Sequence, residues 1–138
     1  MVAFACVANA DSARVIKVLP HFLDLKGRNA VNPSLFDRDA YQQQLRDTPT
    51  NRSALRFDIQ WKARGYESLT LHIDLKGMKG TERTSTNLQA RVTPGMFSKW
   101  TGLTLAGDDY KHFGDLISWR ATLLDGTNVV AERKSFLW

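Results

Sequence analysis

Two neighbouring stretches of the chain alternate strictly between apolar and polar residues. Every second residue is apolar from Leu55 to Trp61, and the same alternation returns from Leu69 to Leu75. Because successive side chains of a β-strand point to opposite faces, each stretch predicts a strand with one buried and one solvated face. A short connection containing Gly65 joins them. The pair is therefore predicted to form an antiparallel hairpin with one face in a core.

The end of the chain carries a second predicted hairpin. Residues 116–124 and 129–138 are rich in strand-forming residues, and the sequence Asp-Gly-Thr-Asn between them is a strong turn signal. A three-residue loop at Gly126 would set Arg120 opposite Glu132, where the two opposite charges attract.

The alternation also predicts which side chains of this hairpin are buried. In the last strand the apolar positions change parity between Ala131 and Phe136, which predicts a β-bulge near Arg133 and Lys134. The inner face of the preceding strand is expected to carry Ile117, Trp119, Ala121 and Leu123.

One segment has the spacing of a helix. Ser34 is followed three residues later by Asp37, an approximate capping box. We expect a single short helix near residues 35–46, which ends before Thr48-Pro49 and covers an open end of the sheets. Four residues fall on one helical face and are predicted to pack on the core: Phe36, Ala40, Tyr41 and Leu45.

The remaining stretches complete an all-β pattern. Arg14–Leu25 predicts an edge strand, or two short strands bent at Pro20, because proline cannot donate to a ladder. Thr81–Val92 predicts a polar, Thr-rich edge that turns toward the core at its end. About seven strands spaced by roughly 8–12 residues predict an antiparallel two-sheet β-sandwich of immunoglobulin or fibronectin-III type within residues 11–138. A small β-barrel is the alternative.

Composition and charge limit the classes of partner that we expect for this protein. The 138 residues are 43% hydrophobic and 24% charged, which is typical of a folded globular domain. The formal net charge is +5, but basic residues are interleaved with acidic ones. The densest basic stretch, Lys76 to Arg83, contains Glu82. A nucleic-acid site usually needs a concentrated basic patch, so we expect no nucleic-acid partner. No apolar run reaches the length of a membrane span.

The first ten residues indicate export. Residues 1–10 are apolar and uncharged, and Ala8-Asn9-Ala10 has the small-x-small form of a signal-peptidase site. We interpret them as the remnant of a signal peptide and expect a periplasmic or extracellular protein. Two alternatives remain open. Cys6 could carry a lipid anchor, or the ten residues could form a first strand of a cytoplasmic protein.

The residues that carry chemistry are sparse. With one cysteine, neither an intrachain disulfide nor a Cys-based metal site can form. No nucleophile elbow, phosphate loop or dinucleotide motif is present, so we expect no catalysis and no cofactor. Asp108, Asp109 and His112 in a predicted loop at residues 106–114 could ligate a metal ion, and a polar turn is the plainer reading.

Aromatic residues near predicted loops suggest a ligand site. Tyr66, Trp100 and Tyr110 fall where side chains are often exposed, and aromatic faces beside polar groups bind sugar rings. In that hypothesis Asp108, Asp109 and His112 orient the hydroxyls. The alternative is that Trp100 and Phe113 close the ends of the core.

Three functions follow from these patterns. The leading hypothesis is a non-catalytic exported domain of a bacterial envelope or secreted system that binds a protein. The second is a carbohydrate-binding module that uses Tyr66, Trp100 and Tyr110. The third is a small metal-dependent site in the loop at residues 106–114.

Overall fold

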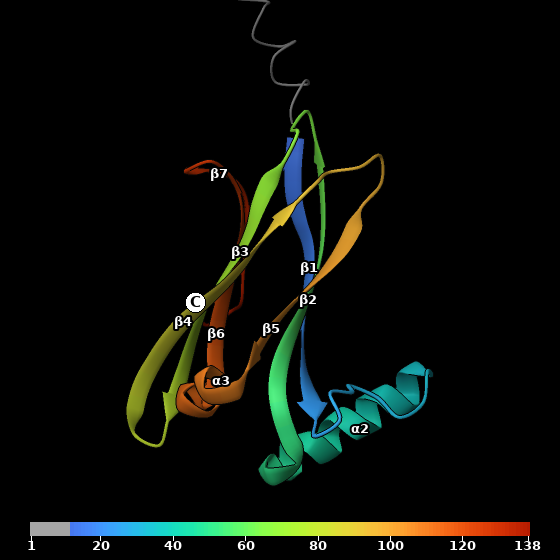
Figure 1. Ribbon diagram of the computed structural model, residues 1–138, viewed down its shortest axis with the longest axis vertical. Coiled ribbons are helices and arrows are strands. Elements are labelled where there is room, and N and C mark those ends of the chain that lie inside the picture. Colours follow the sequence, from blue (N-terminus) through green and yellow to red (C-terminus); the bar gives the residue numbers. More distant parts are fainter. Residues whose placement is uncertain (1–11) are drawn as a thin grey trace, which may run out of the picture.

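The computed structural model describes residues 12–138, which form two antiparallel β-sheets facing each other (Figure 1). The three-stranded sheet has the order β1-β2-β5, and the four-stranded sheet has the order β4-β3-β6-β7. This arrangement confirms the predicted all-β, antiparallel two-sheet sandwich and excludes the small barrel. The strands are β1 (Ser12–Asp24), β2 (Arg52–Arg64), β3 (Leu69–Lys79), β4 (Glu82–Val92), β5 (Lys99–Ala106), β6 (Asp115–Asp125) and β7 (Asn128–Lys134).

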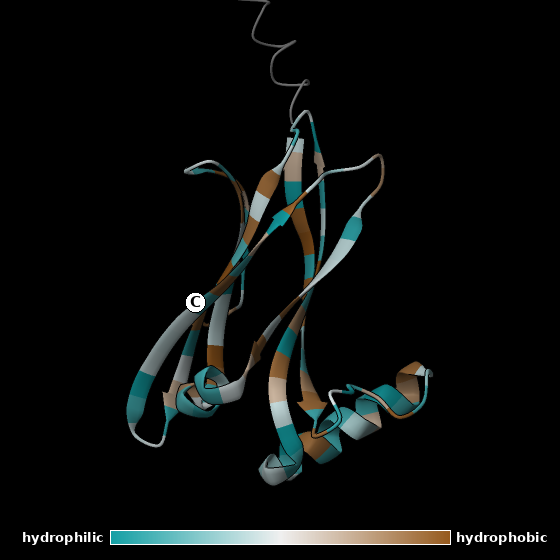
Figure 2. Cartoon of the chain, viewed as in Figure 1, coloured by the Kyte–Doolittle hydropathy of each residue, from teal (hydrophilic) through white to brown (hydrophobic). Residues whose placement is uncertain are grey.

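The core lies between the sheets, and the predicted central hairpin supplies much of it. Phe57, Ile59 and Trp61 of β2 are at most 1% exposed, as are Leu71 and Ile73 of β3. Figure 2 shows apolar and polar residues in turn along these strands. Since burying one large apolar side chain contributes about 1.5–3 kcal/mol, the alternation is sufficient to fix which face points inward.

The two strands that were predicted to lie at sheet edges do so. β1 pairs with β2 and with no other strand of its sheet, and β4 pairs with β3 in the same way. Pro20 lies within β1 opposite Phe57, and the register shifts between Val15 and Lys17. β1 remains one strand through the proline because its other edge has no strand that needs the missing N–H.

The C-terminal hairpin differs from the prediction in its turn. Asp125 pairs with Asn128, so the loop contains two residues, Gly126 and Thr127, instead of three. Gly126 has a φ of 62°, which a residue without a Cβ adopts readily.

The β-bulge is also placed differently. Leu123 of β6 pairs with Ala131 and Leu124 pairs with Val129, so Val130 is an extra, unpaired residue in β7. The predicted bulge near Arg133 and Lys134 is therefore wrong in position, because the extra residue is Val130, next to the turn, and both Arg133 and Lys134 pair in regular register with β6. Glu132 consequently lies opposite Thr122, and its carboxylate reaches diagonally to Arg120 Nε at 2.6 Å.

The alternation of buried and exposed residues in β6 changes parity near the start of the strand. Ala121 and Leu123 are fully buried as predicted, but Ile117 is 47% exposed and Ser118 is buried. The register shift between Lys76 and Gly77 of β3 exchanges the two faces at this end of β6. The prediction of Ile117 as a core residue was wrong for this reason.

Two helices and one 3-10 turn connect the strands of the described part. Helix α2 (Leu35–Asp47) confirms the predicted position, and Ser34 caps it by accepting a hydrogen bond from the Asp37 N–H. The 3-10 turn (Pro49–Asn51) leads into β2. Helix α3 (Gly107–Phe113) occupies the stretch predicted to be a loop, and buried Phe113 packs in the core.

The predictions of a signal-peptide remnant and of a lipid anchor at Cys6 concern residues outside the described range. Within residues 12–138, no helix is long and apolar enough to cross a membrane.

Candidate functional site

Helix α2 is attached to the sandwich by a buried carboxylate. Asp24, the last residue of β1, is 5% exposed. It accepts hydrogen bonds from the Tyr41 hydroxyl (2.5 Å) and from Arg28 Nε (3.0 Å). The backbone N–H groups of Lys26 and Arg28 donate two more, at 2.9 and 2.8 Å. Burial acts to raise the pKa of Asp24, but these four hydrogen bonds outweigh it and hold the pKa well below its usual value.

A side-chain amide makes the second attachment. The side-chain oxygen of Gln42 accepts from the Phe22 N–H at 2.7 Å, and its nitrogen donates to the Phe22 carbonyl at 2.8 Å. The nitrogen also donates to the Asn29 carbonyl at 2.9 Å. Gln42 thus pairs with a peptide group at the open edge of β1 as an added strand would. Two polar anchors therefore fix both the position and the rotation of α2.

These anchors determine which face of α2 is buried. Gln42 and Leu45 are buried and Tyr41 is half-buried, whereas Phe36 is 82% exposed and Ala40 is exposed. The predicted buried face, which included Phe36 and Ala40, is therefore wrong for those two residues. The hydrogen bonds of Tyr41 and Gln42 turn the helix so that its apolar first turn faces solvent.

The exposed apolar residues of α2 form what we call the helix patch: Leu35, Phe36 and Ala40. Leu35 is 67% exposed. Ala40 follows Phe36 by four residues, so the two share a face of the helix. Figure 2 shows apolar residues at the end of α2 that projects away from the sheets. The helix patch is thus a protruding apolar surface on a rigidly held element.

Trp100 is the most exposed of the three predicted ligand-binding aromatics. It lies on β5 opposite Gln60, with 52% of its surface exposed. Its neighbour Thr101 accepts a hydrogen bond from buried Trp61 Nε1, so Trp100 points to the outer face of the three-stranded sheet. Gly102 contributes no side chain to the neighbouring positions. Trp100 therefore does not close an end of the core, which was the alternative prediction for this residue.

The other two predicted aromatics lie elsewhere. Tyr66 and Tyr110 are half-buried and pack against the core. Tyr66 belongs to the connection between β2 and β3, whereas Tyr110 belongs to α3, which lies at the opposite end of the sandwich (Figure 1). The three aromatics therefore do not form one continuous strip.

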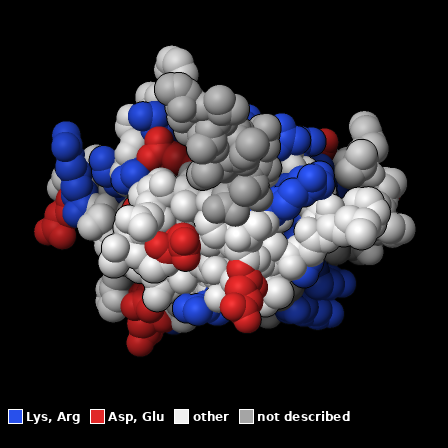
Figure 3. All heavy atoms as spheres, turned by 90° about the horizontal axis from the view of Figure 1, so that it is seen from above, with Lys and Arg blue, Asp and Glu red and all other residues white. Residues whose placement is uncertain are grey.

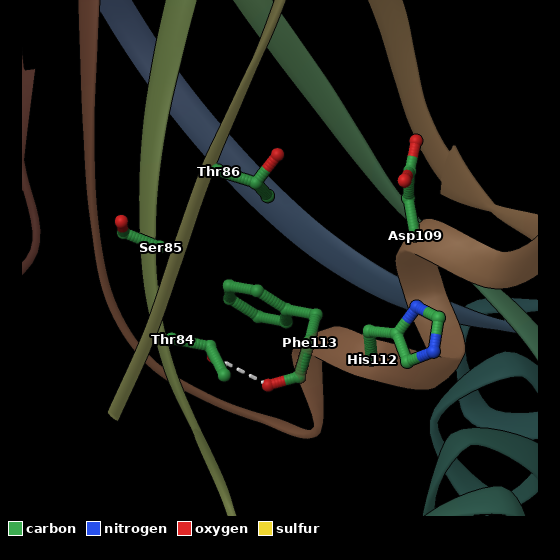
Figure 4. Close-up of a pocket in the computed structure, with 6 residues that line it drawn as sticks. All are labelled: Thr84, Ser85, Thr86, Asp109, His112 and Phe113. Atoms are coloured by element: carbon green, nitrogen blue, oxygen red, sulfur yellow. Dashed lines mark hydrogen bonds between the residues drawn. The ribbon is translucent and has the colours of Figure 1, made fainter. Parts of the chain in front are cut away.

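Helix α3 carries the predicted metal-ligand candidates. Asp108, Asp109 and His112 are all exposed, and the latter two line a shallow pocket of about 290 Å³ (Figure 4). Figure 4 shows the Asp109 carboxylate directed away from the His112 ring. The pocket is closed on one side by the Thr84 hydroxyl, which donates to the Phe113 carbonyl at 2.6 Å. Within residues 12–138, no three His, Cys, Asp or Glu side chains gather in a geometry that could hold a metal ion.

A polar cluster on the three-stranded sheet involves His21, Arg56 and Asp58. His21 Nδ1 lies 2.8 Å from an Asp58 oxygen, and Arg56 Nε lies 3.0 Å from the other. Burial raises the pKa of Asp58, but its hydrogen bonds with His21 and Arg56 outweigh that effect and lower the pKa. No serine, threonine or cysteine hydrogen-bonds to this cluster in the described residues. The His21–Asp58 contact joins the side chains of β1 and β2 across the sheet.

Charges of both signs surround the end of the molecule in Figure 3. Lys and Arg side chains lie around the periphery of this face, and Asp and Glu side chains lie between them. Basic and acidic side chains are therefore interspersed over the part of this face that is drawn in colour.

Sequence reasoning missed the helix patch. The Asp24–Tyr41 and Phe22–Gln42 contacts join residues 17 and 20 positions apart. No local pattern in the sequence signals contacts between residues so far apart.

No family model matches this chain, and no curated protein sequence is similar to it. The fold resembles that in a crystal structure of a protein from Akkermansia muciniphila, with a TM-score of 0.57 and 11% sequence identity. The match covers 91% of this chain and 70% of the other. At this identity the likeness concerns the fold, which is a β-sandwich.

Proposed function

We propose that this protein is a non-catalytic, exported β-sandwich domain of a bacterial envelope or secreted system that binds a protein partner through the helix patch. The observation that carries the proposal is Phe36, which is 82% exposed at the projecting end of a helix fixed by buried polar contacts. Contiguous exposed apolar residues on a soluble domain typically mark an interaction site.

The anchoring of α2 gives this exposure its significance. Burying Phe36 against the sheet would require the helix to rotate, which breaks the hydrogen bonds of Tyr41 to Asp24 and of Gln42 to Phe22. The bond to charged Asp24 contributes about 1.5–3 kcal/mol and a neutral amide bond about 0.5–1.5 kcal/mol, so breaking both costs at least as much as the roughly 1.5–3 kcal/mol that burying a phenylalanine contributes. The helix patch therefore stays available to a partner.

The charges on α2 favour a protein over a lipid surface. Residues 35–47 contain three aspartates and two arginines, so the helix carries a net charge of −1 (2 − 3 = −1). Helices that bind anionic membranes usually have a basic polar face. Exposed Asp39 lies beside Phe36 on the solvent side. A groove with an apolar floor and basic rim fits this face, in the manner of helix-in-groove recognition.

Site-specific photo-crosslinking in the native host tests the proposal. A photoreactive phenylalanine analogue replaces Phe36 in one strain and Phe97 in a second. Phe97 is the matched control, because it is 75% exposed and lies in the connection between β4 and β5, far from α2 (Figure 1). We expect one discrete adduct from position 36, containing a second protein that mass spectrometry identifies, and none of the same mass from position 97.

Other outcomes overturn the proposal. Equal adducts from both positions would indicate random collisions. An adduct that contains two copies of this chain alone would replace the protein partner with a homodimer. Absence of any adduct at position 36, with the protein expressed and folded, would remove the helix patch as a binding site.

Export is supported by Ala8-Asn9-Ala10, whose pattern matches a signal-peptidase site. Mass spectrometry of the protein from its native host tests this part separately. A mature chain that starts at Asp11 in the periplasm or medium is expected, and an intact Met1 in the cytoplasm would contradict it.

A carbohydrate-binding module is the second candidate, favoured by the exposure of Trp100 beside Gln60 on a sheet face. A sugar ring could stack on the indole while the amide orients a hydroxyl. Affinity electrophoresis in gels containing polysaccharides tests this candidate. Retardation that Trp100→Ala abolishes would support it, and equal mobility in all gels would exclude it.

A further inference from the structure

A cleft opens between the sheets at the end of the sandwich that carries α2 and α3. It has a volume of about 720 Å³, within the range of roughly 300–1,000 Å³ that small-molecule sites occupy. Phe22, Leu55 and Leu116 contribute apolar surface to it. Two cations line the same cleft, Arg46 from α2 and Arg52 from the start of β2.

One donor of Arg52 has no partner within the described residues, while the rest of the guanidinium lies against aromatic side chains of the cleft. Its guanidinium stacks over the Phe22 ring, 4.4 Å from the centroid. Its Nε is buried and has no hydrogen-bond partner within the described residues. Burial raises the pKa of Tyr110, and Arg52 beside the Tyr110 hydroxyl counteracts the rise. Buried donors without partners are rare in folded proteins and call for an explanation.

The charge of the cleft favours an anion. Neither Arg46 nor Arg52 forms an ion pair with a carboxylate in the described part of the chain. Arg46 donates to the side-chain oxygen of Gln43 at 2.7 Å. Asp115 is the one carboxylate among the described lining residues, which leaves two positive charges against one negative charge. An arginine pair is well suited to carboxylate and phosphate groups.

We propose that this cleft binds a small organic anion with an apolar body. Arg52 and Arg46 hold the anionic head group, and the apolar body lies against Phe22, Leu55 and Leu116. The site is separate from the helix patch, so it does not depend on a protein partner. It would make the domain a carrier or sensor of amphipathic carboxylates or phosphates.

Binding of four probes to the full chain tests this site. Octanoate and octyl phosphate carry an anion and a chain, 1-octanol carries the chain alone, and inorganic phosphate carries the anion alone. We expect saturable binding of octanoate or octyl phosphate with a rise of several degrees in melting temperature. In nitrogen–proton spectra the Arg52 Nε–H signal, identified by its loss in Arg52→Gln, should shift during the titration.

Variants locate the site. Arg52→Gln is expected to weaken binding of the better anionic probe by roughly 10- to 100-fold, the usual effect of removing a hydrogen bond to a charged group. Arg46→Gln should weaken it less, because Arg46 also bonds to Gln43. Arg91→Gln, an exposed control on β4, should leave it unchanged. Circular dichroism establishes that each variant is folded.

Three results would overturn the proposal. One is the absence of saturable binding of both amphipathic anions at millimolar concentration. A second is equal binding of 1-octanol or of inorganic phosphate, because the site would then recognise only one half of the ligand. The third is full affinity in folded Arg52→Gln. If octanoate binds and octyl phosphate does not, the natural ligand is a carboxylate, and the reverse result assigns a phosphate.

Discussion

Replacing Asp24 with asparagine tests whether a buried carboxylate holds α2 in place. The substitution preserves the size of the side chain but removes the charge that four donors share. If Oδ2 becomes an NH₂ group, it can accept neither the hydrogen bond from the Tyr41 hydroxyl of α2 nor the one from Arg28 Nε. Losing even one hydrogen bond to a charged group costs about 2 kcal/mol, so the melting temperature of a domain this size should fall by roughly 7 °C or more.

Differential scanning calorimetry at pH 7 measures this effect, with Asp47→Asn as the matched control. Asp47 is exposed at the end of the same helix, so its substitution should change stability by less than about 0.5 kcal/mol. If Asp24→Asn melts within 1 °C of the wild type, the carboxylate does not hold the helix, and the argument for a fixed helix patch fails.

The acid side of the stability profile gives a second check on Asp24. Its pKa is lowered in the folded protein, so the unfolded chain takes up a proton first as the pH falls below the unfolded value of about 3.9. The stabilisation is complete above that pH and is lost as the pH falls toward the folded pKa. The difference in melting temperature between wild type and Asp24→Asn should therefore narrow between pH 5 and pH 3, and a constant difference would contradict the assignment.

Three further substitutions test other parts of the structure. Gln42→Leu leaves the Phe22 peptide without its side-chain partner and should destabilise the fold by about 1–3 kcal/mol in urea unfolding; an unchanged midpoint would contradict the amide's role. Gly77→Ala brings a Cβ to 2.7 Å from Phe113 Cζ. It should cost about 2 kcal/mol by overpacking, and a wild-type melting temperature would refute this. Trp100→Ala should cost about 1–2 kcal/mol, because half of the residue is exposed; a loss of the roughly 3–5 kcal/mol typical of a buried tryptophan would make Trp100 structural.

The sheets could be predicted because their signal is local. Apolar residues alternate with period two from Leu55 to Trp61, and burial of one face leaves a single acceptable register. The capping residue Ser34 likewise marked the start of α2. Interactions between neighbouring residues determine both features, so both can be found in the sequence.

The orientation of α2 depends on interactions that are distant in sequence. Phe36 matched the apolar stripe of an amphipathic helix, but the hydrogen bonds of Asp24 and Gln42 fix a different face. Helix α3 was missed because it begins at Gly107 and is followed by Gly114, and glycines at both ends of a short segment are typical of a loop. Residues of β1, β2, α2 and α3 line the cleft beside Arg52. These elements are far apart in the sequence, so no local pattern predicts that they lie next to one another.

The affinity of the protein that crosslinks at position 36 provides the most direct test of the proposed helix patch. Calorimetric titration of the purified partner compares wild type with Phe36→Asp and with Phe97→Asp, an equally drastic change at a similarly exposed residue. We expect Phe36→Asp to weaken binding by about 30-fold or more, as the loss of a central aromatic anchor does, and Phe97→Asp to change it by less than twofold. Equal affinities for wild type and Phe36→Asp would contradict the proposal that the helix patch is the binding surface.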